Sequence, residues 1–380
     1  MKIAIDARFF RKSTGGIGRY TRALIRELAK IDHKNQYLVY LTPEDEEEYD
    51  EETKNLGLKT KNFKKKIIPI VHYSVSEQTK FLKILQKDQL DLVHFTNFNH
   101  PLFYKGKFVV TIHDLTLMLY PPAKAKHSQL KKFGLKLTMN NAVKKAEKVI
   151  AVSKATKKDI INVLKADKEK IDVIYEGIDE QYQQSSVISH QSSVKYGIKK
   201  PYLLFISQWR PHKGIIQLVE AFEILKKQYR ILHKLVIVGK PNSDFPEIPE
   251  AIQHSFRAKD IITPGFIAEE DLPGLYREAS AFVFPSHYEG FGLPPLEAMA
   301  SGVPVVASKV SCMPEILGKA AVYFDPYNPK DMAEQINKVL ENAPLRRVML
   351  KKGFHQIKKY SWAKMASDTL QVYKDVLKIS

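Results

Sequence analysis

Short apolar runs recur along the chain and alternate with longer stretches in which apolar positions repeat every three to four residues. The runs are rich in valine, isoleucine, leucine and phenylalanine, as in residues 108–112, 202–206 and 303–307. Uninterrupted runs of this length are typical of strands that are buried on both faces of a parallel sheet. Stretches such as residues 215–226 have the periodicity of a helix that is buried on one side. This alternation predicts an α/β fold with parallel sheets.

The same pattern gives a map of the chain, whose 380 residues suffice for two domains of ordinary size. A stretch rich in glutamine and serine at 181–194 predicts the linker, so that the first domain covers residues 1–185 and the second 195–361. A lysine-rich tract at 59–66 is expected to be a loop that precedes a strand. Strands are predicted at residues 2–6, 37–41, 67–71, 92–95, 108–112, 149–152 and 171–175, and then at 202–206, 235–238, 261–267, 281–284, 303–307 and 321–324.

The net charge of +18 is concentrated in the first half of the chain. Residues 1–200 hold 37 Lys and Arg against 23 Asp and Glu, whereas residues 201–380 hold 23 against 19. A basic face can bind nucleic acid or an anionic membrane. The sequence has no zinc-ligand spacing, RNA-binding aromatic motif or coiled-coil heptad repeat. A basic nucleic-acid-binding protein nevertheless remains an alternative.

A lysine-rich segment at 120–148 carries apolar side chains at Leu130, Phe133 and Leu137. Two interpretations stay open: a basic amphipathic segment at a membrane interface, or a surface helix whose apolar side packs inward. No stretch approaches the ~20 apolar residues that span a bilayer. The charged N-terminal residues do not form a signal peptide, and the single cysteine, Cys312, fits a reducing compartment. We therefore expect a cytoplasmic protein.

Residues 281–307 predict a strand, a glycine-punctuated loop, a helix and a second strand. Glu289 precedes the helix and Glu297 is expected in its first turn. Backbone N–H groups before a helix favour anions, so a phosphate could bind there between carboxylates that hold hydroxyl groups. The alternative is that both glutamates are ordinary acids, in a loop and at a helix start. The loop amides in question belong to Gly290, Phe291 and Gly292, and Leu293 follows them.

Three further stretches place candidate residues where a strand ends. Gly15, Gly16 and Gly18 form a loop between the first strand and the first helix, which on glycine spacing alone is weak evidence for a phosphate site. His113 and Asp114 follow the strand at 108–112; Asp114 either orients the imidazole or caps the next turn. Arg210 and Lys213 lie in the turn after the strand at 202–206.

The motif Glu-Gly-Phe-Gly-Leu-Pro-Pro-Leu-Glu-Ala, with Phe-Pro-Ser before it and Gly-Val-Pro-Val-Val-Ala after it, resembles the Glu-x7-Glu signature of retaining glycosyltransferases of family 4. Gly-Gly-Ile-Gly-Arg-Tyr and Thr-Ile-His-Asp-Leu are similar to two further motifs of that family. The resemblance extends from Ile3 to the last helix. It implies the GT-B fold, in which two Rossmann-like domains face a cleft and the C-terminal helix, here 362–380, returns to the N-terminal domain.

The resemblance also implies roles. Glu297 would bind ribose hydroxyls, and Glu289 and His113 would hold the donor sugar. Lys213, Arg210 and the amides of Gly15, Gly16 and Gly292 would stabilise the departing diphosphate. Two departures from the family pattern stand out: Glu176 replaces a usual asparagine, and Ser207 and Gln208 occupy a region where many members carry glycine followed by arginine.

The expected reaction transfers a hexose from a nucleotide diphosphate sugar to a glycan or lipid-linked acceptor. Mannose is the first choice for this hexose. GDP-mannose is the first donor, and a UDP- or dTDP-sugar the second. No Asp-x-Asp occurs, so no metal or other cofactor is expected. Expected partners are the donor, the acceptor and an anionic membrane surface to which the protein would bind peripherally; nucleic acid is not expected. A non-catalytic binder of sugar nucleotides is the alternative.

Overall fold

The computed structural model describes residues 1–55, 61–120, 129–183 and 192–379, and its strands form two parallel sheets in two compact units. Unit 1 comprises Met1–Met118, Ser128–Gly177 and Ser361–Ser380, and unit 2 comprises Leu119–His127 and Ile178–Tyr360. The predicted α/β fold with parallel sheets is confirmed. The predicted linker falls largely on residues 184–191, which lie outside the described part of the chain.

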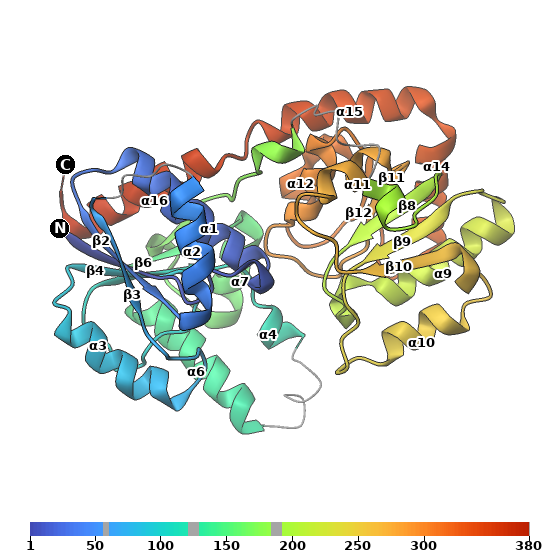
Figure 1. The fold of residues 1–380 in the computed structure, drawn as a ribbon. Helices are drawn as coiled ribbons and strands as arrows, with labels where there is room; N and C mark the ends of the chain where they lie inside the picture. Colours follow the sequence, from blue (N-terminus) through green and yellow to red (C-terminus); the bar gives the residue numbers. More distant parts are fainter. Residues whose placement is uncertain (56–60, 121–128, 184–191, 380) are drawn as a thin grey trace. The chain divides into compact units, whose positions relative to one another are not determined.

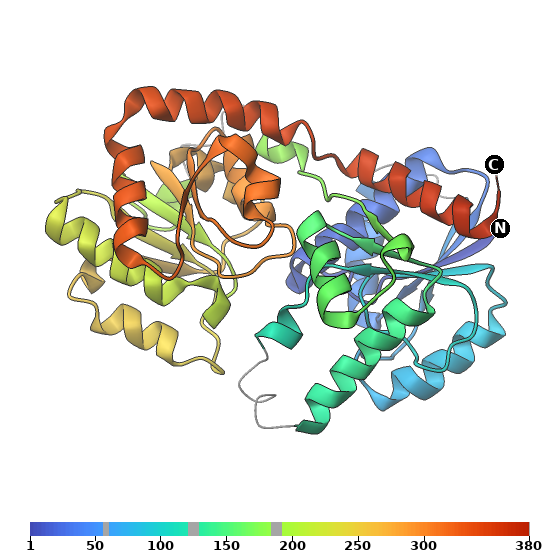
Figure 2. The same ribbon diagram turned by 180° about the vertical axis from the view of Figure 1, so that it is seen from behind.

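Unit 1 contains a seven-stranded sheet in the order β3-β2-β1-β4-β5-β6-β7, and helices flank both of its faces (Figures 1 and 2). Its strands are β1 (Lys2–Asp6), β2 (Gln36–Leu41), β3 (Phe63–Ile67), β4 (Leu92–Phe95), β5 (Phe108–Ile112), β6 (Lys148–Ala151) and β7 (Ile171–Val173). Its helices are α1 (Gly16–Ile31), α2 (Glu46–Asn55), α3 (Leu82–Lys87), α4 (Thr116–Leu119), α6 (Gln129–Lys145), α7 (Lys154–Leu164) and α16 (Trp362–Leu377).

Unit 2 repeats this arrangement with a six-stranded sheet in the order β10-β9-β8-β11-β12-β13. Its strands are β8 (Tyr202–Ile206), β9 (Lys234–Val238), β10 (Ile261–Gly265), β11 (Ala281–Phe284), β12 (Val305–Ser308) and β13 (Ala321–Phe324). Its helices are α8 (Ser192–Lys195), α9 (Ile215–Gln228), α10 (Glu247–His254), α11 (Leu272–Glu278), α12 (Leu293–Ala300), α13 (Met313–Leu317), α14 (Pro329–Glu341) and α15 (Ala343–Ile357).

Both sheets reverse their strand order beside their first strand, between β1 and β4 in unit 1 and between β8 and β11 in unit 2. The strands at these positions are buried almost throughout, as their valine- and phenylalanine-rich sequences require. Loops that leave the carboxyl ends of strands at such a reversal diverge and leave a crevice for a ligand. The fold therefore directs attention to the loops after β1, β4, β8 and β11.

The lysine-rich tract predicted as a loop is in part a strand, so this prediction is wrong for residues 63–66. β3 (Phe63–Ile67) includes Lys64, Lys65 and Lys66 and forms the edge of the sheet. The strand predicted at 67–71 overlaps it only at Ile67, and that prediction is wrong for residues 68–71. Phe63 packs on Tyr37 of β2 with ring centroids 4.3 Å apart. Lysines on an edge strand are compatible with pairing on one side and discourage pairing with another chain on the other. Because three of its five residues are lysines, β3 contains no apolar run from which the sequence could predict it.

The C-terminal helix α16 belongs to unit 1, as predicted, and lies beside α1 (Figure 1). Its Tyr373 is fully buried against His94 of β4, with the hydroxyl 2.5 Å from His94 Nδ1. The other ring nitrogen of His94 lies 2.8 Å from Thr111 Oγ1. The chain reaches α16 past Gly177, where an added Cβ would stand 2.2 Å from the backbone nitrogen of Trp362. This crossing therefore requires a residue without a side chain.

No helix in the described ranges is long and apolar enough to cross a membrane. Helix α6 packs Leu135 and Met139 against the core of unit 1, whereas Phe133 and Leu137 are 66% and 44% exposed. One side of the helix thus packs inward, as the second interpretation expects, and two apolar side chains face solvent; the interface interpretation stays a prediction, and residues 121–128 of the segment lie outside the described part. The side chain of Leu130 lies outside the described part.

We predict that acid weakens unit 1 through His94. Burial, with a smaller contribution from His113, lowers the pKa of His94 from 6.5 to about 3. Between these values the unfolded chain binds a proton that the folded chain does not, so the free energy of unfolding falls as the pH drops from about 6.5 towards 3. For His94 alone the loss at pH 5 is about 2 kcal/mol. Urea unfolding of the wild type and of His94→Gln at pH 7 and pH 5 measures this difference.

The control is Thr111→Val, which removes a hydrogen-bond partner but leaves the titrating ring in place. It should lower stability at both pH values and keep the wild-type pH dependence. An unchanged pH dependence in His94→Gln would show that other groups cause the acid sensitivity.

Candidate active site

Two loops of unit 2 leave adjacent parallel strands at the same edge of the sheet. The residues after β8 include a single 3-10 turn at Pro211–Lys213 before α9, and residues 285–292 connect β11 to α12. β11 pairs with β8 in parallel, so that both loops start side by side at the point where the strand order reverses. Gly214 has a φ of 69°, and an added Cβ would lie 2.3 Å from the carbonyl oxygen of Pro285. A glycine here allows the loops to touch.

Lys213 and Glu289 form an ion pair across these two loops. Lys213 Nζ lies 2.6 Å from Glu289 Oε1, and the two side chains are only 16% and 13% exposed. A charged pair with little solvent around it interacts more strongly than a pair on the surface. The structure therefore brings together two of the predicted site residues that are 76 positions apart in sequence.

The loop after β8 is electrostatically positive. The carbonyl oxygen of Arg210 accepts a hydrogen bond from the N–H of Lys213, but its side chain forms no hydrogen bond or ion pair with the described residues, so the guanidinium group remains available to an anion. The neighbouring His212 is buried, and burial first, followed by the charges of Lys213 and Arg210, lowers its pKa to about 3. His212 is therefore neutral at pH 7, and the positive charge of this turn belongs to Lys213 and Arg210.

The backbone of the Glu289 loop is held by residues that the sequence did not single out. Ser311 Oγ donates to the carbonyl oxygen of Glu289 at 2.5 Å, and Ser311 itself has a φ of 52°. His287 N donates to the carbonyl oxygen of His212 at 2.7 Å. The thiol of Cys312 donates to the carbonyl oxygen of Phe291 at 3.2 Å. A serine or cysteine after a strand carries no recognisable signal for such a role.

Gly292, with a φ of 88°, is the N-cap residue of α12, and the helix begins at Leu293. Glu297 is therefore the fifth residue of the helix, and its predicted position in the first turn is wrong, because Leu293 and the two prolines already form that turn. Its carboxylate is buried, and Oε2 accepts a hydrogen bond from the hydroxyl of Tyr276 at 2.8 Å. Glu297 is thus an oriented, buried acid and not a solvated helix-start residue.

The other predicted residues of this loop, Gly290, Phe291, Gly292 and Leu293, are all buried. Phe291 is buried and its ring meets Tyr360 edge-on at 5.5 Å, and Leu293 is buried as well. These two side chains pack within unit 2. Any contact of Gly290 or Phe291 with a ligand would use the backbone.

In unit 1, His113 follows β5 and both of its ring nitrogens face acceptors. Nδ1 lies 3.1 Å from Glu176 Oε1, and Nε2 lies 3.0 Å from the carbonyl oxygen of Thr96. Tyr20 of α1 packs edge-on against the imidazole with ring centroids 4.9 Å apart. His113 is therefore held through both of its ring nitrogens. Glu176, the residue that departs from the family pattern, is thus the partner of His113.

Asp114 has a different task. Its Oδ1 accepts a hydrogen bond from the backbone N–H of Thr116 at 2.7 Å, at the start of the short helix α4. Of the two roles left open by the sequence, the structure therefore assigns capping to Asp114 and orientation of the imidazole to Glu176.

The three glycine positions after β1 differ in whether the structure requires a glycine there. Gly15 has a φ of 68°, a conformation that favours glycine. Gly18 is confined by packing, because an added Cβ would lie 2.3 Å from Thr14 Oγ1. At Gly16 an added Cβ would meet nothing within 4 Å. Nothing in the described chain thus demands a glycine at position 16, the first residue of α1.

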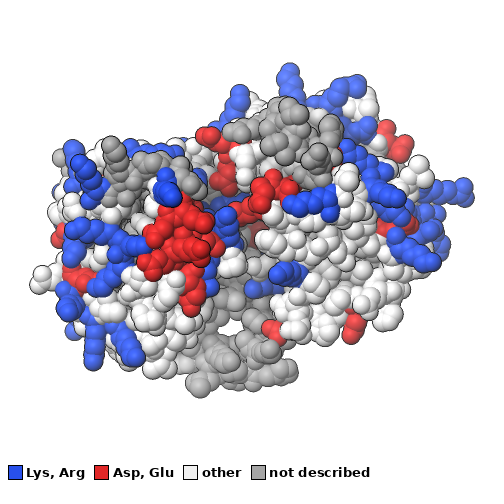
Figure 3. All heavy atoms as spheres, in the orientation of Figure 1, with Lys and Arg blue, Asp and Glu red and all other residues white. Residues whose placement is uncertain are grey.

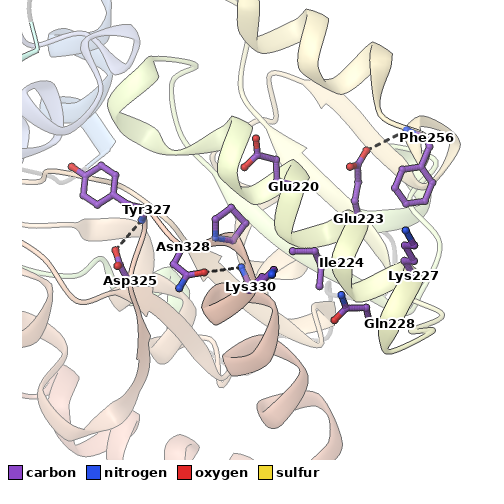
Figure 4. Close-up of a pocket in the computed structure, with 11 residues that line it drawn as sticks. Glu220, Glu223, Ile224, Lys227, Gln228, Phe256, Asp325, Tyr327, Asn328 and Lys330 are labelled. Atoms are coloured by element: carbon purple, nitrogen blue, oxygen red, sulfur yellow. Dashed lines mark hydrogen bonds between the residues drawn. The ribbon is translucent and has the colours of Figure 1, made fainter.

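A hollow of about 770 Å³ lies elsewhere on unit 2, between α9 and the start of α14 (Figure 4). Its walls include Glu220, Glu223, Phe256 and Tyr327, and none of the predicted site residues lines it. Ser255 Oγ and the N–H of Phe256 donate to Glu223 Oε1 and fix it at the rim. The hollow is therefore separate from the charged turn at Lys213.

No group of three or more His, Cys, Asp or Glu side chains is placed to hold a metal ion within the described ranges. His113, Gly15 and Gly16 belong to unit 1, and the remaining predicted site residues belong to unit 2.

Two models of glycosyltransferase families match this chain, one over each half. A model of the group 1 glycosyl transferases matches residues 189–356, and a model of glycosyltransferase family 4 matches residues 14–182. The O-antigen chain mannosyltransferase B of Escherichia coli is 27% identical over 98% of this chain and 100% of its own. The O-antigen chain mannosyltransferase RfbU of Salmonella typhimurium is 28% identical over 71% of each chain.

Solved structures share the fold at lower identity. The Anabaena protein Alr3699/HepE, solved in complex with UDP and glucose, has a TM-score of 0.77, 19% identity and coverage of 99% of this chain and 100% of its own. WaaG, a glycosyltransferase involved in lipopolysaccharide biosynthesis, has a TM-score of 0.72 and 17% identity, and covers 98% of this chain and 99% of its own.

The two Rossmann-like sheets define the GT-B class of glycosyltransferases. Because the two family models together cover most of both units, the chain belongs to the group 1 glycosyltransferases of family 4. It is a nucleotide-sugar-dependent glycosyltransferase.

We predict that His113 and Glu176 are energetically coupled. Removal of either partner leaves the other buried and poorly satisfied, so the double variant should lose less stability than the sum of the single variants. For His113→Gln and Glu176→Gln the coupling free energy should be about 2 kcal/mol. Denaturant unfolding of the two single variants and the double variant measures it.

The matched control replaces Glu176→Gln by Asp114→Asn in the same cycle. Since Asp114 caps α4, its coupling to His113 should stay below about 0.5 kcal/mol. Coupling of His113 to Asp114 and not to Glu176 would contradict the assignment.

Proposed function

We propose that this glycosyltransferase transfers a hexose, most readily mannose, with retention of anomeric configuration to a glycan or lipid-linked acceptor in the synthesis of a cell-surface polysaccharide or glycolipid. The observation that carries the proposal is the Lys213–Glu289 pair, 2.6 Å apart where the strand order of unit 2 reverses. Such an edge is where open α/β sheets bind nucleotides. Two relatives named as O-antigen mannosyltransferases support the choice of polysaccharide synthesis and of mannose.

The charges in unit 2 match the parts of a nucleotide sugar. Lys213 and Arg210 supply positive charge for the diphosphate, which becomes more negative at its terminal phosphate as the sugar departs. The start of α12 at Gly292 adds backbone N–H groups that favour an anion. Glu289 would accept hydroxyl protons of the donor sugar, beside the lysine that binds the phosphate. Glu297, oriented by Tyr276, would accept hydrogen bonds from the ribose.

Residues of unit 1 have a supporting part in the proposal. An added Cβ at Gly16 would meet no side chain or other segment of the described residues within 4 Å, which suits close approach of its backbone to a phosphate. Gly15 precedes it at the start of α1. His113, fixed by Glu176 and Thr96, would line the donor-sugar site.

GDP-mannose is the proposed donor, with a UDP- or dTDP-sugar as the second choice, because two relatives of this chain are O-antigen mannosyltransferases. We propose that no metal ion takes part, since Lys213 and Arg210, at the turn that would bind the diphosphate, would supply the positive charge. Activity assays are therefore run in excess chelator, and a requirement for magnesium or manganese would contradict this part of the proposal.

We further propose that the protein works at the cytoplasmic face of a membrane, which it contacts peripherally through α6. Phe133 and Leu137 are exposed there, and Lys136 lies between them in sequence. Each lysine near an anionic surface adds roughly 1 kcal/mol of attraction. On the face drawn in Figure 3 the basic side chains of unit 1 surround an acidic group at the position of α2, so the attraction is expected to be local to part of the surface.

We predict that Glu289→Gln lowers kcat/KM for GDP-mannose by about 100-fold, the size of effect seen when one oriented transition-state contact is lost. Its cost in stability should be only about 1 kcal/mol, because a single partly buried polar contact is lost. Nucleotide release from a panel of GDP-, UDP- and dTDP-sugars, measured with thermal unfolding, tests both values. Glu270→Gln, at an exposed residue of unit 2, is the control and should change neither quantity.

A folded Glu289→Gln protein with wild-type turnover would remove Glu289 from the proposed mechanism. Absence of nucleotide release by the wild type with every donor would overturn the proposed donor class.

A separate prediction concerns the membrane. Because burial of an exposed phenylalanine or leucine in lipid is favourable, the double variant Phe133→Ser/Leu137→Ser should partition at least about tenfold less onto vesicles that contain anionic lipid. Co-sedimentation at low and high salt measures the partition, which should also weaken with salt. Phe256→Ser, at an exposed phenylalanine of unit 2, is the control and should partition as the wild type does. Equal partition of the wild type onto neutral and anionic vesicles, or none onto either, would contradict peripheral attachment.

A further inference from the structure

Tyr73 of unit 1 combines an exposed aromatic ring with an unfavourable backbone conformation. Its φ is 58°, in the left-handed region that favours glycine, and 54% of the residue is exposed. A bulky residue in this region costs free energy and persists only where its surroundings hold it there. The chain then enters a π-helical turn at Glu77–Phe81, a rare geometry that is frequent at functional sites.

A buried ionic network holds Tyr73 in this conformation. Arg8 is completely buried after β1, and its Nη2 lies 2.7 Å from Asp6 Oδ2 and 2.6 Å from Glu77 Oε1. The second oxygen of Glu77 accepts the backbone N–H of Tyr73 at 3.0 Å. Asn99 Nδ2 donates to Glu77 Oε1 at 2.8 Å. The loop is thus fixed from the end of the first strand of the sheet.

The hydroxyl of Tyr73 is also positioned. Asn97 is buried, and its Nδ2 donates to the hydroxyl oxygen of Tyr73 at 3.0 Å and to Asn99 Oδ1 at 3.0 Å. The hydroxyl proton of Tyr73 has no acceptor within the described ranges. An ordered O–H group that still has a proton to donate stands next to an exposed ring face.

Aromatic rings surround Tyr73, and the charges of Glu77, Asp114 and Arg8 act on its hydroxyl. Phe98 approaches its ring at 5.7 Å, and Phe9 stacks on His72 with centroids 3.7 Å apart. Burial first, and then the charge of Arg8, lowers the pKa of His72 to about 4, so this ring is neutral at pH 7. In the buried ionic network that holds Tyr73, Arg8 is paired with the carboxylates of Asp6 and Glu77. A phosphate would find no free cation here, whereas a neutral molecule with hydroxyl groups and an apolar ring face would fit.

The position of Tyr73 relates it to the proposed transfer chemistry. Its partner Asn97 follows Thr96, and the carbonyl oxygen of Thr96 accepts from His113 Nε2 at 3.0 Å. Two consecutive residues after β4 therefore hold His113 and Tyr73. Both lie at the carboxyl edge of the unit 1 sheet, where its strand order reverses.

We propose that Tyr73 is the stacking platform for the neutral acceptor sugar, and that it selects the acceptor by contact of its ring with the C–H face of a pyranose and by donation of its hydroxyl proton to a sugar hydroxyl. The proposal rests on the glycosyl transfer proposed above and assigns an acceptor-binding residue to it. Tyr73 is a specificity-determining residue that touches the acceptor and takes no part in bond making. Asn97, Glu77 and Arg8 act through it as positioning residues.

The test uses the strain at Tyr73 to separate folding from binding. Tyr73→Gly removes the ring and also relieves the left-handed backbone, so its melting temperature should equal or exceed that of the wild type. Its KM for acceptor should rise at least tenfold with kcat changed less than threefold, and its Kd for GDP-mannose by calorimetry should be unchanged. Tyr73→Phe, which keeps the ring, should raise the acceptor KM about threefold.

The matched control is Gln89→Gly, at another exposed non-glycine residue of unit 1 with a φ of 47°. It should give the same relief of the backbone without any change in acceptor KM. Binding without turnover is read by saturation-transfer NMR with the methyl glycosides of mannose, rhamnose, galactose and N-acetylglucosamine. The wild type should saturate the ring protons of at least one of them, and Tyr73→Gly should abolish the signal.

Two results would overturn the platform: no saturation transfer from the wild type to any of the glycosides, or an undiminished signal in Tyr73→Gly. Failure of the proposed function is distinguishable, since it would appear as absence of GDP-, UDP- and dTDP-sugar binding by the wild type. The glycoside experiment contains no nucleotide sugar and reports on Tyr73 in either case.

Discussion

The parallel pairing of β11 with β8 is the constraint on which the charged turn of unit 2 depends. These strands are separated by two further strands of sequence, yet their hydrogen-bonded register starts both following loops at one edge. Gly214 then permits contact between the loops, and the Lys213–Glu289 pair closes it. Loss of the pairing would separate Lys213 from Glu289, which lie 76 positions apart in the sequence. The pairing of the two strands thus fixes the relative positions of the two loops, and with them the positions of the Lys213 and Glu289 charges.

Unit 1 uses the same topology with different chemistry. Its reversal point carries Arg8 between Asp6 and Glu77, and the neighbouring strand end carries Thr96 and Asn97. Burial opposes the charge of Arg8, but the attraction and hydrogen bonds of the two carboxylates raise its pKa above its ordinary value. A buried ion pair contributes little net stability but fixes geometry where it is fully satisfied. Here the fixed geometry includes a strained tyrosine, whereas the cationic turn of unit 2 leaves Arg210 available.

Buried histidines divide between the two tasks of folding and site construction. His94 is enclosed between Thr111 and Tyr373 and attaches the C-terminal helix to the sheet. His212 lies beneath the cationic turn and stays neutral, so it adds no repulsion to Lys213 and Arg210. His113 differs from both because its two nitrogens face acceptors, one of which is the carboxylate of Glu176. Sequence alone cannot separate these roles, since each histidine lies in or after a predicted strand.

The sequence by itself determined the parallel α/β fold and the ends of most strands, because apolar runs and glycine loops are local patterns. The same patterns made Glu289, Lys213 and His113 candidate site residues, since each follows a predicted strand. It missed β3, since an edge strand can consist of lysines, and it placed Glu297 one turn too early, because two prolines did not reveal where the helix begins. Only the tertiary structure decided that Glu176 and not Asp114 orients His113, that Ser311 holds the Glu289 loop, and that Tyr73 is strained beside Asn97. Each of these depends on contacts between segments far apart in the chain, whose geometry is fixed by strand order and burial and leaves no periodic trace in the sequence.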